Sequence, residues 1–396
     1  MTELAVLGGE PGFPNGVAFF RPATPSLDAV MHRLRPSYER GVLTNGPLVR
    51  ELEEAAADRL EVDHVIAVSS CTTGLMLTFR ALGPLRTVVL PSFTFSASAH
   101  AVAWNGCTPI FAECDPSSFQ LDVTDAAARA VGADAVLATH VFGAPCRPED
   151  VEALAAGPGI PAVFDAAHAF GARRRGRPVG SFGTAEVFSL SPTKPVVAGE
   201  GGLVATGSAE VAELVRLGRG YGDPGDYDTQ LVGLNGRMSE LHAALALESL
   251  AELDANLESR RRLARRYTDR FDAVPGIRAQ RVDDDDASTW KDFTVAVDES
   301  EFGVSRDTLV TSLRAEGVDT RCYFDPPVHR QRSHAGDAAV DLPVTDQVAG
   351  RVVSLPIYPG LAVEVVDRIV ELTERIGASA DAMRAAGVGA AGAATG

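Results

Sequence analysis

Seven short apolar runs alternate with helix-like segments between residues 48 and 250. The runs lie at residues 65–70, 87–93, 109–114, 135–141, 161–166, 185–190 and 202–205. Most are apolar without interruption, as expected for strands that are covered on both faces. The segments at residues 48–60, 73–82, 97–104, 147–156 and 209–217 carry apolar residues at helical spacing. The alternation predicts an α/β fold with a mainly parallel central sheet of about seven strands, in which ligands bind at the carboxyl ends of the strands.

The pattern of expected strands and helices changes beyond residue 274. Strand-like runs at residues 290–297 and 320–323 and helical patterns at residues 305–317 and 364–376 predict a smaller α+β domain. A long helical stretch over residues 239–272 connects the two parts, and we interpret the arginines near its end as a solvated face. We expect a large domain with an N-terminal arm (residues 1–255), a small C-terminal domain (256–377) and a disordered Ala/Gly-rich tail (378–396).

Charge and cysteine usage exclude several classes of protein. The net charge of −17 opposes binding to nucleic acid or to anionic membrane. No apolar run approaches the roughly 18 residues that a membrane span needs, and the N-terminus lacks the pattern of a signal peptide. The five cysteines form no CxxC pair and no zinc-like spacing, which indicates free thiols. These features predict a cytoplasmic enzyme without a metal site.

Lys194 stands out in the segment from Phe188 to Gly202. It lies in the sequence Pro192-Thr-Lys-Pro195, directly after an apolar run and before a Gly-Glu-Gly-Gly turn. Most lysines are solvated surface residues, but the flanking prolines stiffen the backbone here and lysines are rare in this chain. The setting favours a functional amine.

Asp165 ends another apolar run, where an unpaired carboxylate is costly. One interpretation is an N-cap for the following segment. The other pairs it with Lys194, because a lysine that forms an imine and an aspartate that keeps a pyridine nitrogen protonated are the minimal equipment for pyridoxal phosphate (PLP) chemistry. His168, three residues on, would then bond the phenolic oxygen of the cofactor; otherwise it is a structural histidine.

Other residues extend this hypothesis. The run from Ser70 to Gly74 follows a strand and opens a helix, a geometry that cradles phosphate, although Ser/Thr caps are common. Ser189 would add a hydroxyl, and Phe93 either covers the pyridine face or packs in the core. Two residues lie just before the long helix, where they either bind a ligand or cap the helix: Asn235 and Arg237.

The order of these motifs resembles the DegT/StrS-like sugar-nucleotide aminotransferases, which are fold-type-I PLP enzymes. The resemblance extends from residue 43 to residue 359. It implies that Lys194 binds the cofactor and shuttles the proton, that Asp165 pairs with the pyridine nitrogen and that His168 lies near the phenolic oxygen. It further implies ring stacking by Phe93, phosphate contacts from Cys71, Thr72 and Ser189, and a contact from Asn235 to the phosphate of a neighbouring subunit, hence a homodimer. The position of Cys71 is usually glycine in this family.

The resemblance also implies a substrate. Segments at both ends of the chain resemble enzymes that act on dTDP-4-keto-6-deoxyhexoses in antibiotic sugar pathways. The implied reaction transfers the amino group of L-glutamate to C4 of dTDP-4-keto-6-deoxyglucose with ping-pong kinetics. The residues expected at the sugar nucleotide are Arg237, Arg321, Tyr323 and His329.

Other functions stay open from the sequence alone. A 3-keto sugar nucleotide or a keto-cyclitol are alternative acceptors. A PLP-dependent sugar dehydratase would carry histidine in place of Lys194. A non-catalytic PLP-binding regulator is opposed by the acidic charge.

Overall fold

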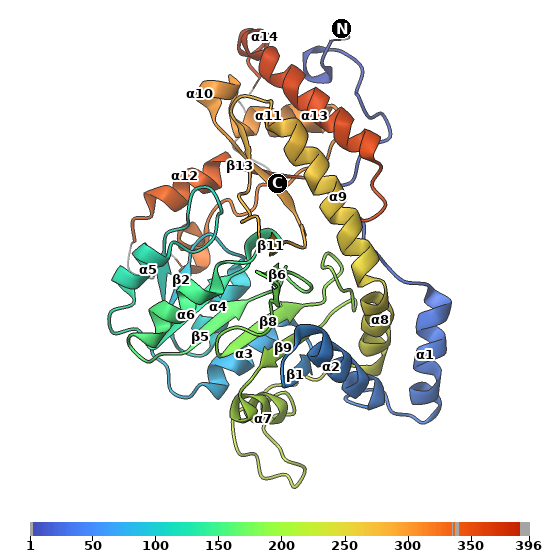
Figure 1. Ribbon diagram of the computed structural model, residues 1–396, viewed down its shortest axis with the longest axis vertical. Coiled ribbons are helices and arrows are strands. Elements are labelled where there is room, and N and C mark those ends of the chain that lie inside the picture. Colours follow the sequence, from blue (N-terminus) through green and yellow to red (C-terminus); the bar gives the residue numbers. More distant parts are fainter. Residues whose placement is uncertain (1–2, 335, 337–339, 389–396) are drawn as a thin grey trace.

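A seven-stranded sheet forms the centre of the larger part of the molecule (Figure 1). In this computed structural model, which describes residues 3–334, 336 and 340–388, the strand order is β1-β9-β8-β5-β4-β2-β3. Only β9 runs antiparallel to its neighbours. The predicted runs are confirmed as its strands: β1 (His64–Val68), β2 (Thr87–Pro91), β3 (Thr108–Ala112), β4 (Ala135–Thr139), β5 (Ala162–Asp165), β8 (Ala185–Ser189) and β9 (Gly202–Thr206).

Helices cover both faces of this sheet, which explains why most positions of its strands are apolar. Along β1, Val65 and Ala67 pack in one core with α2 and α8, while Ile66 and Val68 pack in another with α3, α4 and α7. A third core lies between the sheet and α5 and α6. The helices are α2 (Pro47–Leu60), α3 (Cys71–Ala81), α4 (Ser96–Trp104), α5 (Val123–Arg129), α6 (Pro148–Ala156), α7 (Ala209–Gly218) and α8 (Glu240–Ala251). α1 (Leu27–Glu39) lies beside α8.

A second, three-stranded antiparallel sheet forms the core of the smaller part, at the top of Figure 1. Its order is β10 (Ile277–Ala279), β12 (Phe293–Val297) and β13 (Val352–Leu355). The N-terminal segment belongs to this core, since Leu4 and Val17 pack with residues of α9, α11 and α13. The N-terminal segment therefore contacts the smaller part, and the expected domain bounds stay a prediction. The helices of this part are α9 (Leu253–Phe271), α10 (Glu299–Phe302), α11 (Arg306–Ala315), α12 (Pro343–Arg351), α13 (Val363–Ala378) and α14 (Ala380–Ala385).

Short elements complete the described residues. They are η1 (Ala5–Leu7), η2 (Val141–Gly143), η3 (Val328–Arg330), η4 (Arg332–His334), β6 (Arg173–Arg174), β7 (Arg177–Pro178) and β11 (Asp286–Ala287). The last three strands pair in the order β11-β6-β7 and fasten the loop before β12 to the large sheet. No helix in the described part of the chain is long and apolar enough to cross a membrane.

Three sequence-based expectations about elements are wrong. The long helix over residues 239–272 is interrupted at Glu252 and forms α8 and α9. Residues 320–323 form no strand, because only the bridge between Arg321 and Ser354 pairs there. The tail does not begin at residue 378, since α14 follows and its Met383 is fully buried. Residues 389–396 of that tail lie outside the described residues.

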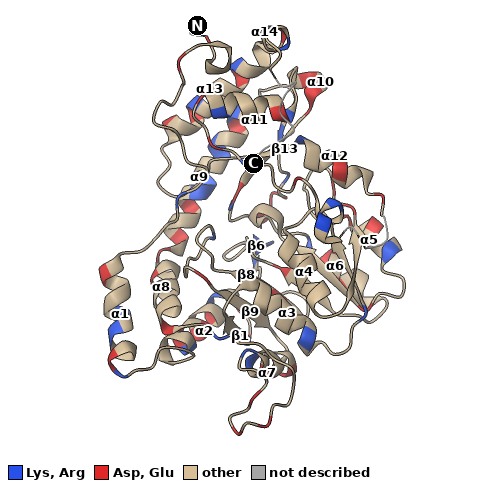
Figure 2. Cartoon of the chain, turned by 180° about the vertical axis from the view of Figure 1, so that it is seen from behind, with Lys and Arg blue, Asp and Glu red and all other residues tan. Residues whose placement is uncertain are grey.

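The arginines of α9 form a solvated face only in part: Arg262 and Arg265 are exposed, whereas Arg260 is buried. Arg260 is buried and donates to the carbonyls of Trp290, Lys291 and Ile357 at 3.0–3.2 Å. Figure 2 shows basic and acidic residues along the same helix. The hydrogen bonds of Arg260 satisfy carbonyls that a buried loop would otherwise leave without donors. Arg260 therefore fastens α9 to the segments that flank the small sheet.

Glu240 connects three helices from the first position of α8. Its side chain is fully buried and accepts hydrogen bonds from Ser37 Oγ at 2.8 Å and from the backbone N–H groups of Gly46, Leu48 and Val49 at 3.0 Å. The N–H groups at the start of a helix have no partner within it. The carboxylate therefore caps α2 and holds α1 and α8 against it.

We predict that Glu240→Gln lowers the free energy of unfolding by about 2 kcal/mol. The NH₂ group of the glutamine would replace one carboxylate oxygen and would face backbone N–H groups that need an acceptor. Urea unfolding of the apoprotein measures this change. Glu39→Gln is the matched control: it removes only an exposed pair with Arg35 at 4.0 Å and should cost less than about 0.5 kcal/mol. Equal effects of the two substitutions would contradict the role of Glu240.

Candidate active site

A cavity of about 310 Å³ opens where the carboxyl ends of β1, β2, β4, β5 and β8 meet. Residues from the loop before β12 and from the loop after α11 close its other side. Parallel strands place their carboxyl ends at one edge, and ligands bind there. The structure brings seven of the predicted site residues to this cavity: Cys71, Thr72, Asp165, His168, Ser189, Lys194 and Tyr323.

Lys194 lies in the loop that connects the antiparallel pair β8 and β9. Its backbone N–H donates to Ser191 O at 3.0 Å, and Ala198 N–H donates to Leu190 O at 2.7 Å, so the loop is closed by its own hydrogen bonds. Pro195 is buried and the Lys194 side chain is half-buried at the cavity. The loop therefore presents the amine over the carboxyl ends of the strands.

The electrostatics of the cavity favour the neutral amine of Lys194. Burial, followed by the positive charge of Lys291, lowers the pKa of Lys194 to about 7. Asp292, Cys71 and Asp165 act in the opposite direction and limit the shift. Burial disfavours a charged group because the interior solvates it poorly. A large fraction of Lys194 is therefore a nucleophile at neutral pH.

Asp165 is held at the end of β5 by a set of hydroxyl groups that the sequence analysis missed. Its Oδ2 accepts from Ser98 Oγ at 2.6 Å, and its Oδ1 accepts from the N–H of Ala167 at 3.0 Å. Ser98 Oγ lies 3.0 Å from Thr94 Oγ1, which lies 3.0 Å from Thr139 Oγ1. This buried chain fixes the carboxylate against the cavity and supplies the hydrogen bonds that a buried charge needs.

His168 is neutral and its tautomer is defined by the backbone. Its Nδ1 accepts from the N–H of Phe142 at 3.2 Å, so Nε2 carries the proton. Burial, with the positive charges of Lys194 and Lys291, holds the pKa of His168 well below its usual range. His168 therefore offers a neutral N–H donor to a ligand oxygen.

The N-terminus of α3 faces the cavity with Cys71 and Thr72. Ser70 caps this helix by accepting from Thr73 N–H at 3.1 Å, which leaves the first N–H groups of the helix for a ligand. A β-carbon at Gly202 would lie 2.6 Å from the N of Cys71, so only glycine lets β9 pass this close to α3. Such a helix end suits an anion.

The expectation for Phe93 is wrong. Its side chain is fully buried and packs with Phe119, Phe142 and Phe324, away from the cavity lining. Phe95, two residues on and 58% exposed, lines the cavity instead. Strand β2 ends at Pro91, so Phe93 lies beyond the sheet and inside a cluster of aromatic rings.

Two expected substrate contacts do not reach the cavity of the described chain. Arg321 pairs with Asp319 at 2.5 Å and lies over the ring of Phe19. His329 Nδ1 lies 2.6 Å from Ser92 Oγ, and its Nε2 lies 3.3 Å from Asp346. Both side chains stabilise the loop that follows α11.

Asn235 and Arg237 also lie away from this cavity. Both are exposed on the segment before α8, where Arg237 lies over the ring of Tyr221 at 5.6 Å. A contact from Asn235 to a neighbouring subunit stays a prediction, since a single chain does not test it.

Lys291 is the functional candidate that the sequence analysis missed most clearly. The chain contains two lysines, and both line the same cavity. Lys291 comes from the loop before β12, far from Lys194 in the sequence, so no local motif connects them. Because the chain has so few lysines, the presence of a second one was the signal in the sequence that could have identified Lys291. Ser191, Thr193 and Glu200 also line the cavity.

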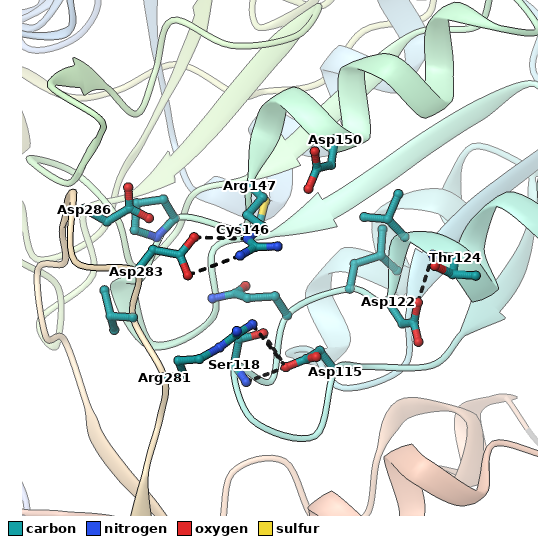
Figure 3. Close-up of a pocket in the computed structure, with 15 residues that line it drawn as sticks. Asp115, Ser118, Asp122, Thr124, Cys146, Arg147, Asp150, Arg281, Asp283 and Asp286 are labelled. Carbon is teal, nitrogen blue, oxygen red and sulfur yellow. Dashed lines mark hydrogen bonds and ion pairs between the residues drawn. The ribbon is translucent and has the colours of Figure 1, made fainter.

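A second hollow of about 360 Å³ lies beside α5 and α6 (Figure 3). Its charged groups satisfy one another: Arg147 donates to Asp283 at 3.1 Å, and Asp122 accepts from the N–H of Thr124 at 2.8 Å. It contains no lysine. We therefore assign the chemistry to the cavity at Lys194, although it is the smaller of the two.

The donors and acceptors of the Lys194 cavity fit PLP. An amine suits the aldehyde, a buried carboxylate suits a protonated pyridine nitrogen, and the N–H of His168 suits the phenolic oxygen. The N-terminus of α3 suits the phosphate, with hydroxyls of Ser189 and Ser191 beside it. We propose these roles for Lys194, Asp165, His168, Cys71, Thr72 and Ser189, with ring stacking assigned to Phe95.

Several known proteins are similar to this chain in sequence and in structure. The chain is 35% identical over 347 residues to a dTDP-3-amino-3,4,6-trideoxy-alpha-D-glucose transaminase from Streptomyces venezuelae, which covers 84% of this chain and 88% of the relative. It is 29% identical over 358 residues to a dTDP-4-amino-4,6-dideoxy-D-glucose transaminase from Escherichia coli, covering 89% and 96%. The crystal structure of DesI in the presence of its TDP-sugar product matches with a TM-score of 0.91 and 34% identity, covering 97% of this chain and 98% of DesI.

The family assignment follows from the extent of these matches. Residues 28–374 match the DegT/DnrJ/EryC1/StrS aminotransferase family, which includes both sheets and the whole cavity. The chain therefore belongs to the DegT/DnrJ/EryC1/StrS aminotransferase family, whose members depend on PLP.

Proposed function

We propose that this PLP-dependent sugar aminotransferase moves the amino group of L-glutamate to C4 of dTDP-4-keto-6-deoxyglucose, in the biosynthesis of an amino-deoxysugar of a natural product. The likeness to DesI carries the proposal, because it covers 97% of the chain at a TM-score of 0.91 and that structure contains a TDP-sugar product. The E. coli relative named for a 4-amino sugar supports amination at C4.

The residues of the cavity divide the work. Bound PLP supplies an aldehyde and an electron-withdrawing ring that makes the carbon next to nitrogen acidic. In the first half-reaction the amine of Lys194 takes a proton from the carbon that bears the amino group of the donor. In the second half-reaction it gives a proton to the former carbonyl carbon of the sugar. Asp165 holds a proton on the pyridine nitrogen, and the Ser98–Thr94–Thr139 chain keeps its carboxylate oriented.

We further propose a cytoplasmic homodimer. Large apolar side chains are exposed together on α1, α8 and the segment between α1 and α2: Leu27, Met31, Tyr38, Leu43 and Leu241. Because α1 and α8 contact each other, these exposed apolar side chains favour an interface on this side of the molecule. In such a dimer Asn235 would approach the phosphate site of the other subunit, and Arg237 the sugar nucleotide.

An acceptor with a 3-keto group is the second candidate. The S. venezuelae relative is named for a 3-amino sugar and is 35% identical, slightly above the 29% of the relative named for a 4-amino sugar. Among the sugar contacts expected from the sequence, Tyr323 alone lines the cavity of the single chain. A keto-cyclitol stays a third candidate.

A panel of acceptors tests the substrate. Holoenzyme with L-glutamate is expected to convert dTDP-4-keto-6-deoxyglucose to a product that retains the nucleotide, carries one amine at C4 and is formed at least 100-fold faster than from 3-keto sugar nucleotides or keto-cyclitols. Mass spectrometry and NMR of the product measure this. Preferred amination of a 3-keto sugar or of a cyclitol would overturn the proposal for C4.

Borohydride reduction tests Lys194 directly, since the chain offers two lysines. We expect the reduced cofactor on the peptide that contains Lys194 and none on the peptide that contains Lys291. Lys194→Ala should lose the label and at least about 10³-fold in the rate of transamination, because it removes the general acid and base. Lys291→Met is the matched control and should keep the label. A label on Lys291 in the wild type would reject the assignment.

The pKa of Lys194 gives a prediction for the apoprotein. As pH rises through about 7, the amine loses its proton and becomes reactive. Limited acetylation with peptide mass spectrometry should therefore show a reactivity midpoint near 7 for Lys194. In the urea-unfolded protein the midpoint should move to about 10.4, the ordinary value for lysine. A midpoint above 9 in the folded protein would disagree with the electrostatics described here.

A further inference from the structure

Lys291 is a buried cation that the proposed roles of the cavity do not use. Its Nζ lies 2.9 Å from both carboxylate oxygens of Asp292, and the two side chains are 6% and 3% exposed. The ring of Tyr323 lies 5.6 Å from the same ammonium. Lys291 lines the cavity whereas Asp292 lies behind it. Because an ammonium has three N–H donors, one remains for a ligand.

The backbone around Lys291 is fixed from three sides. Trp290 adopts a φ of 48°, a left-handed conformation that is costly for a bulky residue. Arg260 donates to the carbonyl of Lys291 at 3.1 Å, and Thr289 Oγ1 donates to the carbonyl of His168 at 2.6 Å. The loop therefore directs Lys291 into the cavity and is fastened to the segment that carries Asp165 and His168.

The charge of Lys291 reaches the reaction centre. Lys291 lines the same cavity as Lys194 and His168, and its positive charge contributes to the lowered pKa of both. Among the described residues that line the cavity, Lys194 and Lys291 are the two lysines and no arginine joins them. Once Lys194 is bonded to the cofactor, Lys291 is the cation that this chain offers to a substrate.

Ping-pong transamination requires one cavity to accept two unlike substrates. An amino-acid donor carries a carboxylate one bond from the carbon that loses the amine. A keto sugar is uncharged at its ring, and its diphosphate is separated from the reacting carbon by the width of that ring. A cation beside Lys194 therefore matches the donor carboxylate better than the diphosphate.

We propose that Lys291 binds the α-carboxylate of the amino donor and pairs with Asp292 alone when the keto sugar occupies the cavity. This inference rests on the proposed aminotransferase function. It assigns the donor to a side chain of this chain's own loop before β12. Lys291 thereby offers a positive charge to the donor carboxylate in one half-reaction, and Asp292 neutralises that charge in the other.

The test separates the two half-reactions of the holoenzyme. Glutamate is added without sugar, and the conversion of the cofactor from its aldehyde to its amine form is followed by absorbance. Lys291→Met is expected to raise the half-saturating glutamate concentration at least 10-fold. The half-reaction of the amine form with the keto sugar should change less than 3-fold. Binding of glutarate, which has both carboxylates and no amine, should weaken at least 10-fold in a calorimetric titration.

Variants at Asp292 distinguish donor binding from a structural role. Asp292→Asn retains Lys291 and should bind glutarate as well as or better than the wild type. The double variant Lys291→Met/Asp292→Asn is neutral at this site and should remain impaired for glutamate. Recovery of glutamate binding in the double variant, or an unchanged glutamate dependence in Lys291→Met, would overturn the proposal. A larger effect on the sugar half-reaction would assign Lys291 to the diphosphate instead.

The same experiment reports separately on the proposed function. The wild-type reaction with glutamate tests whether the enzyme accepts this donor at all. The comparison between variants, and the titration with glutarate, test Lys291 whichever sugar is the acceptor.

Discussion

The burial of the central sheet on both faces is the constraint on which the site depends. Alternate residues of β1 enter opposite cores, so a polar group along a strand needs buried partners, as Glu186 of β8 has in His140. Polar groups gather where the strands end, and parallel strands end at one edge. Asp165, Ser189 and the N-terminus of α3 meet there because Asp165 ends β5, Ser189 ends β8 and α3 begins shortly after β1. The fold thus concentrates the polar groups that the core excludes.

Charges in a cavity of this kind are stable only with partners. Asp165 has the hydroxyl of Ser98 and the N–H of Ala167, and Lys291 has Asp292. Lys194 is the exception: it has no carboxylate bonded to it among the described residues, and its lowered pKa is the consequence. The same desolvation that makes a lysine ammonium costly makes its amine reactive.

Local patterns predicted the parts of the site that lie at strand ends. Lys194 and Asp165 are found from a few neighbours each, and the seven strands from uninterrupted apolar runs. The expectation for Phe93 failed because alternation cannot assign a face to a side chain once the strand has ended at Pro91. Lys291 lies in the loop before β12, so its place at the same cavity as Lys194 follows from packing between the two parts. Sequence separation of this kind leaves no local signal.

Cys71 shows how a departure from the family pattern is accommodated. The resemblance described above expects glycine at this position, beside the proposed phosphate site, yet the Sγ of Cys71 points into the sheet, 3.6 Å from Val187 O and 3.9 Å from Asp165 Oδ1. The side chain of Cys71 is therefore accommodated beside β8, away from the backbone N–H groups at the start of α3. Burial and the charge of Asp165 raise the pKa of the Cys71 thiol well above its ordinary value. The thiol is thus a neutral donor, and it places no second negative charge beside the carboxylate that must hold the pyridine nitrogen.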